Sequence, residues 1–316
     1  MGFTGFDIKF VQFFTIIAVL SMGCHAHAQD LEPRAYSNVP VGLNFLLAGY
    51  GYTAGGVLFD PAVPLDNANI KIHGTVLAYA RSIRIGKMSG KIDMVVPYAW
   101  LSGTADFQGQ PVSRIVSGFG DPRVRFSLNL FGAPAMPLSG FKDYKQNLVV
   151  GVSLQVFMPA SQYDADRLVN IGTHRFTFKP ELGISKTIWH FYLELATGAS
   201  FYTVNNDFYQ GKTRSQSPIG YVQGHVVYNI WHGIWAALDG TYYWGGRTTV
   251  DGIEGNDLQE NSRFGLTFAL PVNIHHSIKL HASTGVSTRT GSDFDAIAIV
   301  CQYRWGRDLK KIKKSD

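Results

Sequence analysis

The chain has 316 residues, of which 13% are aromatic, 34 are glycine and only 16% are charged, whereas soluble domains carry about 25% charged residues. The formal net charge is +5, but residues 307–316 hold five basic and two acidic side chains and supply three of these charges. Because the rest of the chain is nearly neutral, the composition excludes the basic footprint of a nucleic-acid-binding protein. We therefore expect no nucleic-acid partner.

Residues 1–28 read as a signal peptide for secretion. Lys9 is followed by the mostly apolar residues 10–23, and Ala26-His27-Ala28 forms a small-x-small cleavage site before Gln29. The apolar stretch is shorter than the roughly 20 residues that a membrane-spanning helix needs. After cleavage Cys301 is the one remaining cysteine, so the mature chain cannot build a disulfide framework or a cysteine-based metal site.

After an N-terminal segment over residues 29–39, side chains alternate between apolar and polar in twelve stretches, which predicts antiparallel strands. One stretch sets Leu148, Val150 and Val152 against Gly151 and Ser153. Ten and fourteen strands are the alternatives, since Pro97 and Pro180 fall inside two of the stretches. The predicted strands cover 40–52, 69–83, 91–103, 115–131, 146–158, 172–184, 189–203, 217–230, 234–246, 259–271, 276–288 and 294–305.

The connections between these strands alternate in length. Long polar links such as 159–171 and 204–216 follow the odd-numbered strands, and most other links are short turns such as 231–233. An even strand count with short turns on one side and long loops on the other is typical of bacterial outer-membrane proteins. The sequence thus predicts an all-β fold, a transmembrane antiparallel β-barrel over residues 40–305 that contacts outer-membrane lipids.

The last predicted strand ends in aromatic residues. Tyr303 and Trp305 lie on its apolar face, and we expect the barrel assembly machinery to read them as an assembly signal. Residues 306–316 follow as a basic periplasmic tail with little apolar surface to bury, so we expect this tail to be disordered.

If the apolar phase of each strand faces lipid, most strand charges face the lumen. This assignment avoids the roughly 2–4 kcal/mol that Arg or Lys costs on the lipid face at mid-bilayer. Two readings of these charges stay open: a lumen that guides a polar or amphipathic solute, and a barrel plugged by ion pairs between its walls. The residues of the predicted solute pathway are Arg123, Arg125, Arg175, Lys179, Glu181, Glu194, Arg263 and Lys279.

Enzyme and cofactor signals are weak. His275-His276-Ser277 lies at a short turn without the glycine-rich nucleophile turn of hydrolases. The histidines lack metal-ligand spacing, and Gly49-Tyr50-Gly51 lacks the setting of a dinucleotide site. We therefore expect no catalytic residues, no metal and no cofactor.

Several short sequence motifs occur in an order that resembles that of the outer-membrane transporters named for the meta-cleavage pathway of phenol degradation. His174 and Phe176 stand where that family usually has Asn and Trp. The resemblance implies a barrel for small, often aromatic compounds, and it transfers no catalytic or ligand residues. The motifs are Gly49-Tyr50-Gly51-Tyr52, residues 55–61, 118–125, 172–176 and 179–183, Gln223-Gly224-His225, Gly245-Gly246-Arg247 and residues 285–289.

The leading hypothesis from sequence is an outer-membrane channel for passive uptake of a small organic solute, aromatic or anionic in character. Arg123, Arg125, Arg175 and Lys179 would attract carboxylate or phenolate groups, and Glu181 and Glu194 would hold those cations in place. The alternatives are a closed structural or adhesin-like barrel that acts through its loops and, third, an outer-membrane hydrolase.

Overall fold

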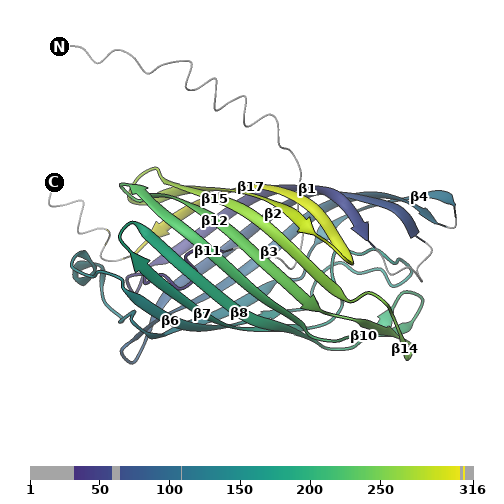
Figure 1. Cartoon of the computed structure of the whole chain (residues 1–316), viewed down its shortest axis with the longest axis horizontal. Helices are drawn as coiled ribbons and strands as arrows, with labels where there is room; N and C mark the ends of the chain where they lie inside the picture. Colours follow the sequence, from purple (N-terminus) through teal and green to yellow (C-terminus); the bar gives the residue numbers. More distant parts are fainter. Residues whose placement is uncertain (1–31, 59–64, 108, 307–308, 310–316) are drawn as a thin grey trace, which may run out of the picture.

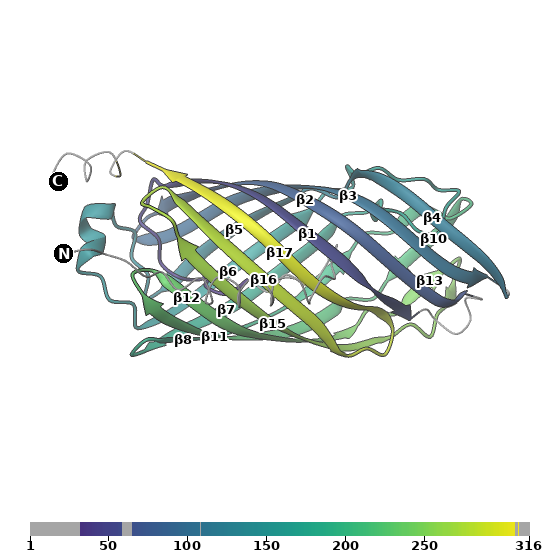
Figure 2. The same ribbon diagram turned by 90° about the horizontal axis from the view of Figure 1, so that it is seen from above.

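The computed structural model describes residues 32–58, 65–107, 109–306 and 309, and these residues form a β-barrel (Figures 1 and 2). The predicted signal peptide and most of the predicted tail lie outside the described residues. Leu309, a described residue of this tail, is buried, at 3% exposure. Within the described residues, no helix is long and apolar enough to cross a bilayer.

The main sheet has thirteen strands in the order β2-β1-β17-β16-β15-β12-β11-β8-β7-β6-β5-β3-β4, and pairing of β2 with β3 closes it. Because β4 and β5 follow one another along β3, the thirteen strands fill twelve positions around the barrel. The strands are β1 (Asn44–Leu58), β2 (Leu65–Ile85), β3 (Met88–Phe107), β4 (Gln110–Phe119), β5 (Arg123–Phe131), β6 (Leu148–Phe157), β7 (Thr177–Ile188), β8 (Phe191–Tyr202), β11 (Ile219–Trp231), β12 (Ile234–Gly245), β15 (Gln259–Pro271), β16 (His276–Ser287) and β17 (Gly291–Trp305).

The alternation predicted from sequence is confirmed. On β6 Leu154 is 44% exposed and its neighbour Gln155 is 3% exposed. On β12 Leu238 is 49% exposed and Asp239 is 1% exposed. Large apolar side chains therefore cover the outside of the barrel, where they suit lipid, and polar side chains point into the lumen.

Two proline positions are explained by interruptions in strand pairing. The sequence predicts one strand over residues 115–131. The structure instead has two strands there, β4 and β5, separated by residues 120–122. Pro97 lies between the part of β3 that pairs with β5 and the part that pairs with β4. Pro180 lies at a gap between the Phe178 and Glu181 pairs of β7 with β8. A residue without a backbone N–H fits at both places, because a ladder hydrogen bond is missing there anyway.

β1 begins and β17 ends at the same end of the barrel, near the periplasmic side in the bacterial arrangement (Figure 2). At this end the long link between β5 and β6 contains the 3-10 helix η1 (Leu138–Lys142). The opposite, outer end carries the projecting parts of β2, β3 and β4. It also carries a second sheet that the sequence prediction missed, formed by β9 (Asn205–Phe208), β10 (Lys212–Gln216), β13 (Thr248–Val250) and β14 (Ile253–Glu254).

The segment that precedes β1, residues 32–43, does not lie on the outside. We call it the inner segment, because its side chains contact lumen-facing residues of distant strands. The first strand starts at Asn44 and not at residue 40 as predicted. Before it, Gly42 N donates to Ser82 O at 3.0 Å and Ser82 N donates to Leu43 O at 2.9 Å, which anchors the inner segment to β2.

Candidate functional site: the barrel lumen

The inner segment is fastened to the lumen by charged groups. Arg125 Nη2 donates to Glu32 Oε1 at 3.0 Å, and Lys91 Nζ lies 3.8 Å from the same carboxylate. The backbone N of Arg34 donates to Glu194 Oε2 at 2.6 Å. Charge-assisted hydrogen bonds of this kind are among the stronger polar contacts in proteins, so the segment is held at several points.

Tyr36 fixes the middle of the inner segment. Its hydroxyl donates to Glu181 Oε1 at 2.7 Å, and its ring lies over the backbone of two glycines on β6 and β7. A Cβ atom at Gly151 would come within 2.4 Å of the Tyr36 ring, and one at Gly183 within 2.0 Å. Only glycine at these two positions lets the ring approach the wall so closely.

One side of the lumen, formed by β5 to β8, β11, β12 and β15, is densely polar. We call it the polar wall. Glu181 Oε2 accepts hydrogen bonds from Tyr221 Oη at 2.8 Å and from Gln223 Nε2 at 3.2 Å. Asp239 bonds both His225 Nδ1, at 2.6 Å, and Thr267 Oγ1, at 2.7 Å. These contacts join neighbouring strands and bury the polar groups. Among the described residues, the buried His225 Nε2 has no hydrogen-bond partner.

The other side, formed by β17, β1, β2 and the middle of β3, has small apolar residues facing inward. We call it the apolar wall. These residues are half-buried for the most part, whereas the polar wall is almost fully buried. The strand register aligns them, together with the polar Gln302 at the periplasmic end, in rows across the four strands. The rows are Gln302, Leu47, Ala78 and Val95; Val300, Gly49, Val76 and Pro97; and Ala298, Gly51, Gly74 and Ala99.

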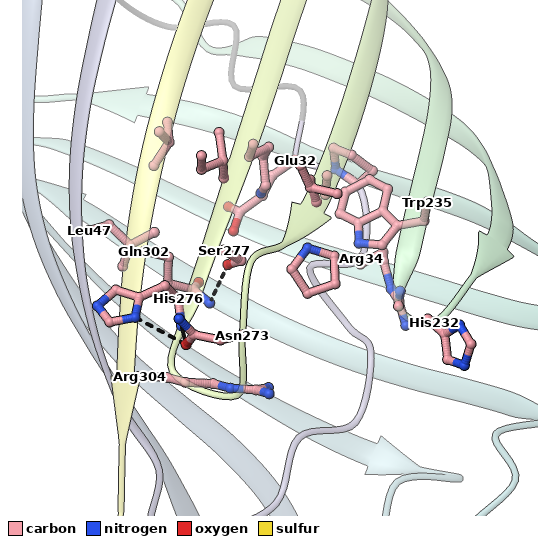
Figure 3. A pocket seen from close by; sticks show the side chains of 18 residues that line it. Glu32, Arg34, Leu47, His232, Trp235, Asn273, His276, Ser277, Gln302 and Arg304 are labelled. Atoms are coloured by element: carbon pink, nitrogen blue, oxygen red, sulfur yellow. Dashed lines mark hydrogen bonds between the residues drawn. The ribbon is translucent and has the colours of Figure 1, made fainter. Parts of the chain in front are cut away.

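A cavity of about 400 Å³ lies at the periplasmic end of the lumen, between the inner segment and strands β12 and β15 to β17. Figure 3 shows Glu32, Arg34 and Trp235 on one side of it and Gln302 and Arg304 near β17. Within its lining the cationic side chains, Arg34, Lys279 and Arg304, outnumber the single acidic one, Glu32.

The Trp235 ring lies within about 6 Å of two of the cations. The Arg34 guanidinium is 5.6 Å from the Trp235 ring centroid and the Lys279 ammonium is 5.9 Å from it. Both distances suit cation–π attraction. The cavity therefore combines apolar, aromatic and cationic surfaces, and this combination fits an organic molecule that carries a negative or electron-rich group.

Seven of the eight residues predicted for the solute pathway lie on barrel strands with their side chains on the lumen face. Arg123 and Arg125 are on β5, Lys179 and Glu181 on β7, Glu194 on β8, Arg263 on β15 and Lys279 on β16. Lys279 lines the cavity, and Lys179 lies 4.4 Å from the Tyr221 ring centroid. Arg263 Nη2 donates to the Phe294 carbonyl at 2.7 Å.

Arg175 lies apart from these residues. It precedes β7, which begins at Thr177 and not at residue 172 as predicted. Its Nη2 donates to Gln216, and its guanidinium lies 4.2 Å from the Tyr202 ring centroid. Burial and the neighbouring Arg214 guanidinium lower the pKa of Arg175 to about 10. Arg175 thus belongs to the outer end of the molecule, beside the second sheet.

The two glutamates bond groups of the inner segment and of the polar wall. Glu181 accepts from the hydroxyls of Tyr36 and Tyr221, and Glu194 accepts from the Arg34 backbone and from Ser185 Oγ at 2.9 Å. Arg125 is bound by Asp93 and Glu32. The carboxylates therefore serve mainly to hold the inner segment and the wall, and the cations next to the cavity are Arg34, Lys279 and Arg304.

The His275-His276-Ser277 string does not form a hydrogen-bonded His–Ser pair among the described contacts. His276 Nδ1 bonds Asn273 Oδ1 at 3.1 Å, and Ser277 Oγ accepts from Gln302 Nε2 at 3.2 Å, as Figure 3 shows. His275 Nδ1 lies 2.9 Å from the Arg304 carbonyl. Among the described residues, no group of three or more His, Cys, Asp and Glu side chains is placed to hold a metal ion.

These features define the class of protein: a transmembrane β-barrel with twelve strand positions, which is a fold of the bacterial outer membrane. The structure resembles an outer membrane channel from Pseudomonas putida F1, with a TM-score of 0.75 and 16% identity, over 87% of this chain and 100% of that chain. It also resembles the transport unit of the Escherichia coli autotransporter AIDA-I, with a TM-score of 0.50 and 8% identity, over 96% of this chain and 99% of that one.

A third similar structure is the beta domain of the Bordetella autotransporter Brka, with a TM-score of 0.50 and 8% identity, over 84% of this chain and 100% of that chain. The comparison with curated proteins gave no match. Residues 61–299 match the family described as "Putative MetA-pathway of phenol degradation". The chain belongs to this family, as the resemblance of its sequence motifs indicated.

Sequence reasoning missed the inner segment and the difference between the two walls. Residues 32–43 show no alternation, and Tyr36 and Glu181 are 145 positions apart in the chain. The glycines Gly151 and Gly183 were a usable signal, because they lie on the lumen phase of adjacent strands where a side chain is otherwise expected.

Proposed function

We propose that this protein is an outer-membrane channel through which small organic solutes, aromatic or anionic in character, pass down their concentration gradient. The observation that carries the proposal is the cavity at the periplasmic end, where the charged groups of Arg34 and Lys279 lie 5.6 Å and 5.9 Å from the Trp235 ring centroid. A ring can pack against the indole and the apolar surface while a carboxylate or phenolate faces the cations.

The division of the lumen supports a path along the apolar wall. The inner segment is bound to the polar wall through Glu32, Arg34 and Tyr36. Leu47 and Val300 of the apolar wall instead line the cavity. A solute with an apolar body can therefore move beside the segment, because small apolar residues offer it no polar group to displace.

The same arrangement favours a channel over an enzyme or a closed barrel. The serine and histidines of residues 275–277 are bonded to other groups, so no activated nucleophile is formed among them. A barrel filled by ion pairs would leave no cavity of about 400 Å³ beside the inner segment. Barrel assembly machinery as a partner, and the reading of Tyr303 and Trp305 as its signal, remain part of this proposal.

The test is ion permeation through the purified protein in planar lipid bilayers under a gradient of sodium benzoate. The reversal potential gives the permeability of benzoate relative to sodium, and a sodium chloride gradient shows whether the aromatic anion is favoured over a simple one. We expect a preference for benzoate. Lys279→Ala should reduce this preference about fivefold, since an ion pair at about 4 Å in a wet site is worth about 1 kcal/mol.

Lys186→Ala is the matched control, because Lys186 is exposed on β7 and bonds Asn147 away from the cavity. It should leave the benzoate preference unchanged. Heat-modifiable mobility on gels confirms that each variant is folded. If folded wild-type protein conducts neither salt above the level of protein-free bilayers, the channel proposal is wrong and the closed structural or adhesin-like barrel replaces it.

A further inference from the structure

A second cavity lies at the outer end of the molecule, where β2, β3 and β4 project beyond the rest of the barrel (Figure 2). We call it the outer pocket. Its volume is about 240 Å³, and the residues used in the argument below are Ile70, Leu101, Ala105, Val112, Leu168 and Val169. It lies between the inner faces of these strands and the link formed by residues 158–176.

The interior of the outer pocket is apolar. Leu101 is 7% exposed and belongs to a cluster with Ile72, Ala99 and Ile171, against which Ile70 and Val169 pack. Val112 and Leu168 line the pocket and are 41% and 36% exposed. Apolar side chains that face a cavity and stay partly exposed favour an apolar occupant, because its entry removes their surface from water.

Three charged residues line the outer pocket, Arg114, Asp166 and Arg167, and Arg114 is engaged with the loop that covers it. Arg114 Nε donates to the Val169 carbonyl at 3.3 Å, and Arg114 Nη2 lies 3.8 Å from Asp164 Oδ2. The loop is also held from the second sheet, since Gln210 N donates to the Ala165 carbonyl at 2.7 Å. Arg114 therefore fastens the cover of the pocket, and its charge is balanced by Asp164.

The floor of the outer pocket continues into the apolar wall. Ile70 and Leu101 lie on the same strands as Ile72 and Ala99, and the next row inward pairs Gly74 with Ala99 and Gly51. Ile171 packs on this junction. The pocket thus adjoins the outermost row of the apolar wall, where Ile72, Ala99 and Leu101 are buried against Ile171.

From these observations we infer that the outer pocket is an entry site that binds a neutral single-ring organic compound. An engineered apolar cavity of about 150 Å³ holds benzene, so a pocket of about 240 Å³ has room for one ring with a small substituent. The inference rests on the proposed channel function for the direction of travel, but binding itself can be measured without any flux.

The experiment uses the full-length protein in lipid nanodiscs and fluorine NMR of two probes, 4-fluorobenzyl alcohol and 4-fluorobenzoate. Empty nanodiscs correct for partition of the probes into lipid. We expect saturable binding of the neutral alcohol. Ala105→Phe, which fills the pocket from β3, should weaken this binding about tenfold or more, corresponding to about 1.4 kcal/mol.

Ser102→Phe is the control, since Ser102 lies on the opposite face of the same strand and outside the pocket. It should bind the alcohol like the wild type. Val112→Asp provides a second variant that does not depend on a buried substitution, because Val112 is partly exposed and the new carboxylate would face the pocket. It should also weaken binding of the alcohol.

The inference is wrong if Ala105→Phe and Val112→Asp both bind the alcohol as tightly as the wild type does. It is also wrong if the wild type binds the benzoate probe more tightly than the alcohol and both variants abolish this benzoate binding. Sodium benzoate conductance is measured on the same preparations. If conductance is present and the pocket variants change nothing, the entry site is wrong while the channel proposal stands. If binding at the pocket is found without conductance, the channel proposal fails separately.

Discussion

The two walls of the lumen carry the same structural role, closing a barrel, with opposite chemistry. The polar wall buries Glu181, His225 and Asp239 in hydrogen bonds that run from strand to strand and to the inner segment. The apolar wall presents Gly, Ala and Val in aligned rows that stay half-buried. The difference shows how one barrel can hold a segment firmly on one side and leave a smooth surface for a solute on the other.

The largest expected effect tests the phase assignment on which both walls depend. Val152 faces outward and Ser153 faces the lumen next to Tyr36. Val152→Arg should prevent stable insertion, because a charge on the lipid face costs about 2–4 kcal/mol at mid-bilayer. Ser153→Arg should insert far better. Heat-modifiable mobility of the two variants is the measurement, and equal loss of the folded form in both would contradict the assignment.

The next effect concerns the apolar wall. A Cβ atom added at Gly74 would lie 4.0 Å from the Gly51 carbonyl oxygen, the nearest atom outside its own stretch of chain. A side chain at this position therefore has room to point into the lumen. Gly74→Phe should lower benzoate conductance close to the level of protein-free bilayers. Gly240→Phe is the control. Gly240 also has open space around it, but it lies between the lumen-facing Asp239 and Thr241, so its side-chain position faces outward. Conductance that survives in Gly74→Phe would place the path elsewhere.

A smaller effect is expected at the polar wall. The double variant Tyr36→Phe with Glu181→Gln removes the contact between the inner segment and β7. Such a hydrogen bond to a charged group contributes about 1.5–3 kcal/mol, so its loss should loosen the segment and raise single-channel conductance. Glu254→Gln, at the exposed Arg247 pair of the second sheet, is the control. Unchanged conductance in the double variant would show that other contacts, such as Glu32 with Arg125, suffice to hold the segment.

The smallest effect is expected outside the lumen, where the last strand of the apolar wall ends. Tyr303 and Trp305 stack at 5.5 Å, and Trp305 also lies 6.2 Å from Tyr79. Tyr303→Ala with Trp305→Ala should reduce the yield of assembled barrel in cells while leaving the channel properties of the purified remainder unchanged. Phe191→Ala, an exposed aromatic on β8, is the comparison. Equal yields of the wild type, the double variant and Phe191→Ala would show that Tyr303 and Trp305 are not an assembly signal.

The sequence by itself determined the barrel and its orientation of side chains. Alternation with a period of two decides which residues face lipid, and this pattern is local, so Ile299, Cys301 and Tyr303 could be assigned outward without any structure. The twelve strand positions followed from the same pattern. The strand break at residues 120–122 was missed, although Gly120 and Pro122 within it are local strand-breaking signals. Its match to Pro97 on the neighbouring strand could not be predicted, because the pairing of two strands is a long-range relation.

Tertiary structure alone decided what fills the lumen. Tyr36 reaches Glu181 across 145 positions of sequence, and the pairing of Arg125 with Glu32 joins residues 93 positions apart. The second sheet likewise forms because the links 204–216 and 247–258 meet at the outer end. Alternation states only that a side chain points inward. Which inward groups meet depends on the register and closure of the whole barrel, and these long-range relations have no local signal in the chain.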